Sequence, residues 1–205
     1  MAFPDRVYPH GGGFLDDYAR SYARAVASVS RDAFEAAAQA LVRTIAAGGT
    51  IFSCGNGGSA AIANHLLCDF LKGMRTGSGL RPLVSSLSGS IELITAVAND
   101  IAYEEVFAFQ LGALAKAGDA LISISSSGNS PNIVKALDWC RANGVTSIAF
   151  TGFSGGKAQG MADISLHAAE GNYGVVEDVH QSLMHALAQY IRHSRLSGDV
   201  AQTVF

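Results

Sequence analysis

Apolar residues follow two alternating patterns along this chain. Between residues 14 and 47 they recur at helical spacing without a proline, which predicts one long helix or two consecutive helices that end at Gly48 and Gly49. Further along, short apolar runs bounded by glycine or polar residues predict strands. These runs lie at residues 50–54, 82–87, 119–124, 145–151 and 163–167, with helical stretches at 59–72, 90–116, 131–142 and 175–193.

Strands that alternate with helices pair in parallel through crossover connections, so the pattern predicts an α/β three-layer sandwich. We find no repeat and no linker, and therefore expect a single domain. It divides into N-terminal helices over 1–48, the sandwich over 49–195 and a loose tail over 196–205. In such a sheet, ligands bind at the carboxyl ends of the strands, where the strand order reverses. The loops after the first three strands are the expected location of a site.

Composition narrows the class of protein. The 205 residues are 49% hydrophobic and 15% charged, which excludes a disordered chain. No apolar run approaches the roughly 18 residues of a membrane span, and no signal peptide is recognisable. A net charge of −3 gives no basic surface for nucleic acid, and three cysteines are too few for a disulfide framework. We expect a soluble, cytoplasmic protein whose sparsely charged surface is partly buried against sister subunits.

A glycine-rich loop, CGNGGSA at residues 54–60, follows the first strand. Gly55, Gly57 and Ala60 match the spacing of a dinucleotide-binding turn. That motif also needs an acidic residue at the end of the second strand. In this chain the first acidic residue after that strand is Glu92. The phosphate-binding loop of nucleotide hydrolases needs a Gly-Lys-Ser/Thr sequence, which is absent. We therefore expect no nucleotide cofactor.

A serine-rich loop, SSSGNSP at residues 125–131, enters a predicted helix. A helix N-terminus carries a partial positive charge and free N–H groups, so it binds anions well. The alternative is that Ser130 only caps the helix, with Pro131 at its first position. Capping accounts for these two residues and leaves the three preceding serines unexplained. The loop therefore favours a phosphate site.

Three motifs in this order, CGNGGSAAIANH, AVANDIAYEEVF and ISISSSGNSPN, resemble the sugar isomerase (SIS) domain, and within it the phosphoheptose isomerase family. The resemblance extends to about Tyr190. It implies a five-stranded parallel sheet of the flavodoxin-like type and a homotetramer with active sites between subunits. It also implies an aldose–ketose isomerase acting on sedoheptulose 7-phosphate or a related phosphosugar.

The resemblance also assigns residues. Its phosphate contacts fall on Ser59, Ser125, Ser126, Ser127 and Ser130, and its other substrate-binding elements on Asn56, Gly57, Gly58, Asn99, Asp100 and Glu177. Its base falls on Asp69 and its acid on His185. In some family members the side chains at the positions of His65, Asp69, Glu177 and His185 bind zinc.

Two of these positions, and a third in the loop after the second strand, depart from the family pattern. Asp69 replaces a Glu, Glu177 replaces a Gln, and Ser90 replaces an Asp. These changes are compatible with isomerase chemistry and leave heptose specificity open, and they favour the non-catalytic alternative given below. The added negative charge of Glu177 strengthens the attraction for a cation.

The candidate site residues support the same chemistry when they are considered independently of the resemblance. His65 and Asp69 are four residues apart, so they share one helix face. Moving a proton between neighbouring carbons through an enediol needs one base and one acid, as a carboxylate and a histidine supply. Two histidines and two carboxylates also suit zinc or another divalent ion. We expect His65, Asp69, Glu177 and His185 to converge, and His180 to face elsewhere.

Simpler roles remain open for some of these residues. His65 could be a histidine on a helix face that makes only local hydrogen bonds. Glu177 could serve only to complement the dipole of the last helix. A non-catalytic SIS module that binds a phosphosugar or a protein partner is the alternative function, since the family includes a member that associates with a replication initiator. The retained carboxylate–histidine pair favours the enzyme.

Overall fold

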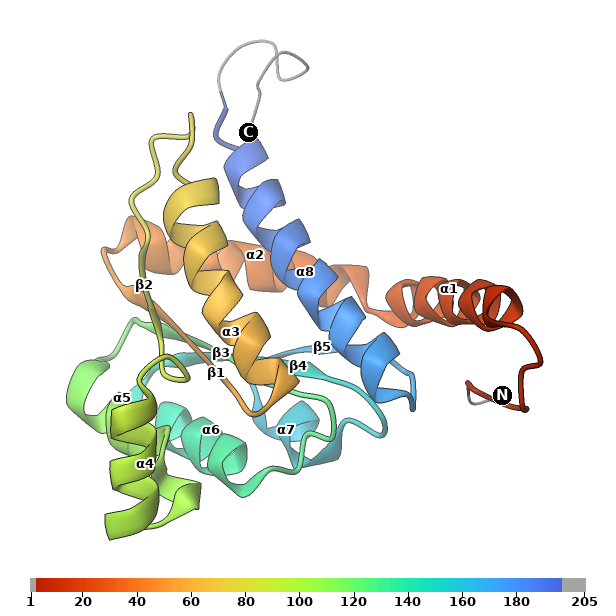
Figure 1. Ribbon diagram of the computed structural model, residues 1–205. Helices are drawn as coiled ribbons and strands as arrows, with labels where there is room; N and C mark the ends of the chain where they lie inside the picture. Colours follow the sequence, from red (N-terminus) through yellow and green to blue (C-terminus); the bar gives the residue numbers. More distant parts are fainter. Residues whose placement is uncertain (1–2, 197–205) are drawn as a thin grey trace.

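The computed structural model describes residues 3–196, and its elements alternate between helices and strands (Figure 1). In chain order they are α1 (Gly11–Ser28), α2 (Arg31–Ala46), β1 (Thr50–Gly55), α3 (Gly58–Cys68), a π-helical turn (Asp69–Gly73), β2 (Leu83–Ser86), α4 (Ile91–Asp100), a 3₁₀ turn (Tyr103–Glu105), α5 (Ala108–Leu114), β3 (Ala120–Ser125), α6 (Pro131–Asn143), β4 (Thr146–Thr151), α7 (Gly156–Met161), β5 (Ile164–His167) and α8 (Tyr173–His193). The predicted tail lies almost wholly outside the described residues.

The five strands form one parallel sheet in the order β2-β1-β3-β4-β5, which confirms the predicted α/β sandwich. The order reverses between β1 and β3, because the chain goes from β1 outward to β2 and then returns to the other side of β1. The loops that leave β1 and β3 diverge there, and this is where open α/β sheets bind ligands.

Each face of the sheet has its own core. On one face, β-strand residues such as Ile122 and Phe150 pack with α2, α3 and α8, and on the other, residues such as Phe52 and Leu121 pack with α4, α5, α6 and α7. Figure 1 shows α3 and α8 running side by side over the sheet. Because β3 is buried on both faces, its sequence ALISIS reads as a nearly continuous apolar run.

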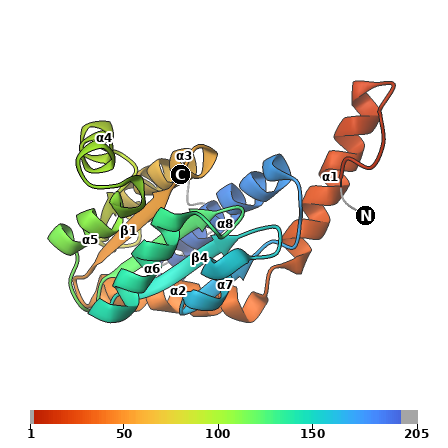
Figure 2. The same cartoon turned by 90° about the horizontal axis from the view of Figure 1, so that it is seen from below.

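The helical pattern over residues 14–47 is two helices. Ser30 interrupts it, and its hydroxyl caps α2 by accepting the Ala33 N–H at 3.1 Å. The first helix, α1, projects from the body of the molecule (Figure 2). Of its 18 residues, Ser21 and Ala25 are buried.

Two local features differ from the sequence prediction. The helix expected over 59–72 changes to π geometry at Asp69, where the Met74 N–H donates to the Asp69 carbonyl. The short helix α7 was not predicted. Among residues 3–196, no helix combines the length and the apolar character that a bilayer crossing requires.

Candidate active site

A cavity of about 140 Å³ opens at the carboxyl ends of β1 and β3. Both loops singled out in the sequence contribute to it, together with the start of α8. It is lined by Asn56, Ser59, Ile124, Ser125, Ser126, Ser127, Ser130, Tyr173 and Glu177. Seven of the predicted substrate-binding residues therefore line one cavity, at the switch point of the sheet.

The glycine-rich loop needs its glycines for close contact. A Cβ on Gly55 would lie 2.5 Å from the backbone oxygen of Ser59, so only glycine allows the first turn of α3 to pack here. Gly57 takes a positive φ of 54° as the N-cap. The Asn56 amide exchanges hydrogen bonds of 2.9 Å with buried Asn132 and so ties this loop to α6.

The backbone of the serine loop contacts the backbone of the segment that follows β4. Gly128 has a φ of 65°, and a Cβ there would lie 2.0 Å from the Gly155 carbonyl oxygen. The Gly128 and Ser126 carbonyls accept the N–H groups of Ala158 and Gly152, each at 2.9 Å. These contacts with the segment after β4 hold the loop in the observed shape.

Two serine hydroxyls of this loop are free to bind a ligand. The Ser126 hydroxyl is buried and meets no partner within the described part of the chain. Ser130 is the N-cap residue of α6, yet its side chain makes no capping hydrogen bond. The capping role weighed from the sequence is therefore not observed. Because buried polar groups are nearly always bonded, an oxyanion is the partner that these hydroxyls and the α6 N-terminus suit.

Glu177 belongs to this cavity and lies apart from the two histidines. Its carboxylate rests on the start of α3, where a Cβ on Gly58 would lie 2.4 Å from Oε2. His185 follows eight residues later on α8, a rise of about 12 Å along the helix. The predicted convergence thus holds for three residues and fails for Glu177.

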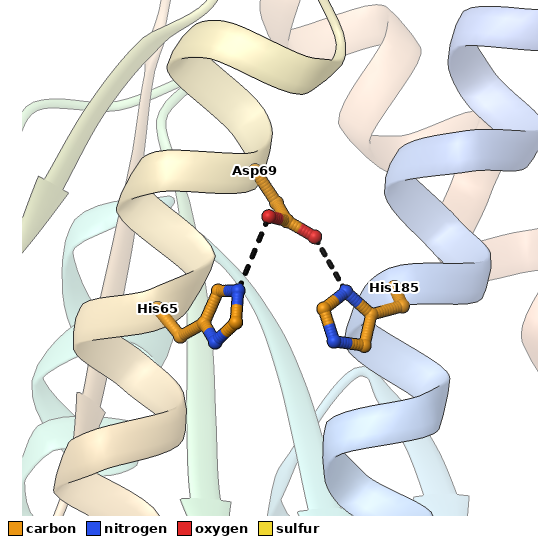
Figure 3. A group of neighbouring side chains, drawn as sticks. All are labelled: His65, Asp69 and His185. Atoms are coloured by element: carbon orange, nitrogen blue, oxygen red, sulfur yellow. Dashed lines mark hydrogen bonds and ion pairs between the residues drawn. The ribbon is translucent and has the colours of Figure 1, made fainter. Parts of the chain in front are cut away.

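His65, Asp69 and His185 converge between α3 and α8, and each histidine faces the carboxylate (Figure 3). Asp69 Oδ2 lies 2.5 Å from His185 Nδ1, and Asp69 Oδ1 lies 3.3 Å from His65 Nε2. The carboxylate stands at the start of the π-helical turn, a geometry often found at functional sites. One potential ligand atom from each residue lies within 4.8 Å of the others, so this donor set fits a divalent ion.

Gln181 completes this group and was not anticipated. Its Nε2 lies 2.8 Å from His185 Nε2 and 3.2 Å from His65 Nδ1. Its spacing four residues before His185 puts both side chains on the same face of α8, a signal that the sequence does contain.

The remaining predicted residues lie elsewhere. Asn99 and Asp100 end α4, are exposed and bond to each other at 2.8 Å, outside the cavity lining. Ser90 caps α4 by accepting the Leu93 N–H. His180 faces away from the site as expected, and burial lowers its pKa to about 4, so it is neutral at physiological pH.

Comparisons with known proteins agree with this geometry. The SIS domain family model matches residues 14–152. A phosphoheptose isomerase of Colwellia psychrerythraea is 38% identical over 77% of this chain and 81% of its own length. One from Paramagnetospirillum magneticum is 36% identical over 87% of this chain and 94% of its own.

A solved structure extends the agreement to three dimensions. The structure of a phosphoheptose isomerase from Francisella tularensis superposes with a TM-score of 0.82 at 30% identity, covering 89% of this chain and 96% of that one. The chain therefore belongs to the SIS domain family, and it is an isomerase of that family.

Proposed function

We propose that the protein interconverts a ketose phosphate and an aldose phosphate, with sedoheptulose 7-phosphate or a related phosphosugar as substrate. The observation that carries this proposal is the 2.5 Å contact between Asp69 Oδ2 and His185 Nδ1. The base lies in the π-helical turn that continues α3, and the acid lies on α8. The first turns of α3 and α8 border the anion cavity. The phosphoheptose isomerases that the chain resembles act on such a sugar phosphate by name.

In this proposal the serine loop binds the phosphate and the sugar carbons extend toward Asp69. The Asp69 carboxylate takes the proton from the carbon next to the carbonyl, while the His185 N–H protonates the carbonyl oxygen, which gives an enediol. Asp69 then returns its proton to the former carbonyl carbon. The hydroxyl on the carbon that lost its proton gives its O–H proton back to His185 and becomes the new carbonyl, which completes the isomerisation. Both transfers need hydrogen-bond distances to the substrate, about 2.6–3.2 Å. The contact between Asp69 and His185 places base and acid side by side, so that one substrate can reach both.

The direct test is proton exchange. Incubation with sedoheptulose 7-phosphate in deuterated water should give the aldose isomer and deuterium on the carbons beside the carbonyl. A panel of phosphorylated ketoses of five to seven carbons identifies the preferred sugar. The non-catalytic alternative predicts saturable phosphosugar binding with no exchange for any sugar in the panel, and that result would refute the isomerase proposal.

A divalent ion, with zinc as the first candidate, fits the donor set of His65, Asp69 and His185. When bound, such an ion supplies Lewis-acid polarisation of the carbonyl. We expect a chelator to lower the isomerisation rate and added zinc to restore it. We also expect zinc affinity to weaken as the pH is lowered, because histidine binds metal only in its neutral form. Full activity in a protein shown by elemental analysis to lack metal would mean that the three side chains act alone.

We further propose that the chain assembles as a homotetramer. The projecting helix α1 packs against α8 and still leaves Leu15 66% and Phe14 39% exposed, and exposed apolar side chains on a projecting helix gain stability by packing on a sister subunit. Light scattering should give a mass of about 85 kDa for four chains of 21.2 kDa each. A mass near that of one chain would contradict this.

A further inference from the structure

The α8 side of the anion cavity differs in chemistry from the serine side. The serine loop and the N-terminus of α6 offer hydroxyls and N–H groups. Tyr173 and Glu177 are four residues apart on one face of α8, and they offer an aromatic ring and a carboxylate. A carboxylate repels a phosphate, whereas an aromatic face packs well against carbon. We therefore expect the phosphate on the serine side and the carbon attached to it on the α8 side.

Among residues 3–196, Tyr173 is the one aromatic residue that lines this cavity, and 60% of its surface is exposed. It is the first residue of α8, and the N-cap residue Asn172 accepts the Val175 N–H at 3.1 Å. This cap fixes the backbone from which the tyrosine projects. The ring therefore has a defined origin and surface left for a ligand to cover.

A second aromatic residue, Phe153 in the loop after β4, packs against Tyr173. The two ring centroids lie 4.7 Å apart with their planes at 59°, within the favourable range for an aromatic pair. Phe153 has a φ of 51° and is, among the described residues, the only one besides glycines with a positive φ. This conformation is strained for a bulky side chain, and glycine would adopt it freely. The strain indicates a role for the Phe153 ring.

The surrounding backbone holds Phe153 in this conformation. Its N–H donates to the Glu170 carbonyl at 2.8 Å, and the adjacent Gly152 N–H donates to the Ser126 carbonyl at 2.9 Å. A Cβ on Gly152 would lie 2.4 Å from the Val176 side chain, so this loop also packs closely on the first turn of α8. Phe153 is therefore fixed relative to both the serine loop and the start of α8.

We propose that Tyr173 is a specificity-determining residue that contacts the carbon chain next to the phosphate, and that Phe153 positions its ring. The serine loop alone accepts any phosphate, because its hydroxyls and N–H groups contact only the phosphate oxygens. The aromatic face adds affinity for a phosphate that carries a carbon substituent, so the cavity distinguishes a phosphate ester from free phosphate. That the ester is a sugar phosphate rests on the proposed function. The contact itself does not depend on catalysis.

Isothermal titration with three ligands tests this assignment. Inorganic phosphate has no carbon, glycerol 3-phosphate has a short chain, and sedoheptulose 7-phosphate has the full chain of the proposed substrate. In Tyr173→Ala we expect the Kd of both esters to rise about tenfold, because an apolar contact with the chain is lost. The Kd of inorganic phosphate should change by less than about twofold. Tyr173→Phe keeps the ring and should bind all three ligands like the parent protein.

The substitution Phe153→Gly removes the support and leaves the backbone in place, because glycine adopts this φ without strain. Both esters should bind about threefold more weakly, while inorganic phosphate binds as before. A merely structural role would weaken inorganic phosphate as well, because the loop of Phe153 is bonded to the serine loop.

The matched control is Tyr190→Ala, since this tyrosine lies near the other end of α8, bonds to Glu35 at 2.9 Å and is not part of the cavity lining. It should leave all three Kd values unchanged.

Several results would overturn the proposal. Equal losses for phosphate and esters in Tyr173→Ala would make the tyrosine a structural part of the cavity wall, and unchanged ester binding would mean that it contacts no ligand. A loss in Tyr173→Phe as large as in Tyr173→Ala would assign the effect to the hydroxyl. Unchanged ester binding in Phe153→Gly would remove Phe153 from the positioning role.

Proton exchange decides the proposed function separately. If the esters bind with the expected pattern and no sugar exchanges a proton, the isomerase proposal fails and the role of Tyr173 stands. If exchange occurs and the esters bind the parent protein no better than inorganic phosphate, the isomerase proposal stands and the role of Tyr173 fails.

Discussion

Substituting Asp69 by Asn should reduce isomerisation by about 100- to 10,000-fold, the contribution of a positioned general base. The amide has nearly the same shape but does not accept a proton from carbon. It also withdraws the carboxylate from His65 and His185. The loss should appear in kcat and in deuterium exchange, while the Kd for a phosphosugar stays within a few-fold of the parent value.

The control for this variant is Asp138→Asn on α6, which makes the same change at an exposed position far from the histidines. It should retain parent activity. Retention of exchange in Asp69→Asn would remove Asp69 from the role of base. Loss of phosphosugar binding along with exchange would point instead to a disrupted site.

Removing the hydroxyls of Ser127 and Ser130 together should weaken phosphosugar binding by about 100-fold or more. A hydrogen bond to a charged group contributes about 1.5–3 kcal/mol, and both residues line the cavity at the start of α6. Isothermal titration with the phosphosugar measures the change. Inorganic phosphate should lose affinity in parallel.

Ser154→Ala offers a matched comparison, because this serine is exposed in the loop after β4 and is not part of the cavity lining. Its affinity for phosphosugar should equal that of the parent protein. An unchanged Kd in the Ser127→Ala, Ser130→Ala double variant would mean that the anion binds elsewhere.

The sequence predicts the strands and most helices well because their signals are local. Glycine and polar residues bound each apolar run, and helical periodicity marks the crossovers. Helix α7 lacks such a signal, since Gly156 and Gly160 lower its intrinsic propensity. It forms because Ala158 is buried and its N–H bonds to Gly128, and both contacts depend on the folded chain.

The same distinction applies to the site. His65 and Asp69 could be paired from their spacing, because one turn of helix places them together. The resemblance to the SIS family predicted that His185 lies beside them. The position of Glu177 could not be inferred from spacing, because it depends on how closely α8 approaches the glycine at the start of α3. The contacts of Gln181 were not predicted although its spacing from His185 is visible in the sequence, because they involve both histidines, which only the fold brings together.

The contact between Gly128 and the Gly155 carbonyl has a consequence for binding energetics. Fixing the backbone of a residue costs about 1–2 kcal/mol in conformational entropy. In the serine loop that cost is met during folding, because backbone hydrogen bonds from the segment after β4 already hold it. An incoming anion therefore meets a preorganised cradle and loses little affinity to loop ordering. Sequence change can then tune affinity through the hydroxyls alone, while the shape of the cradle stays constant.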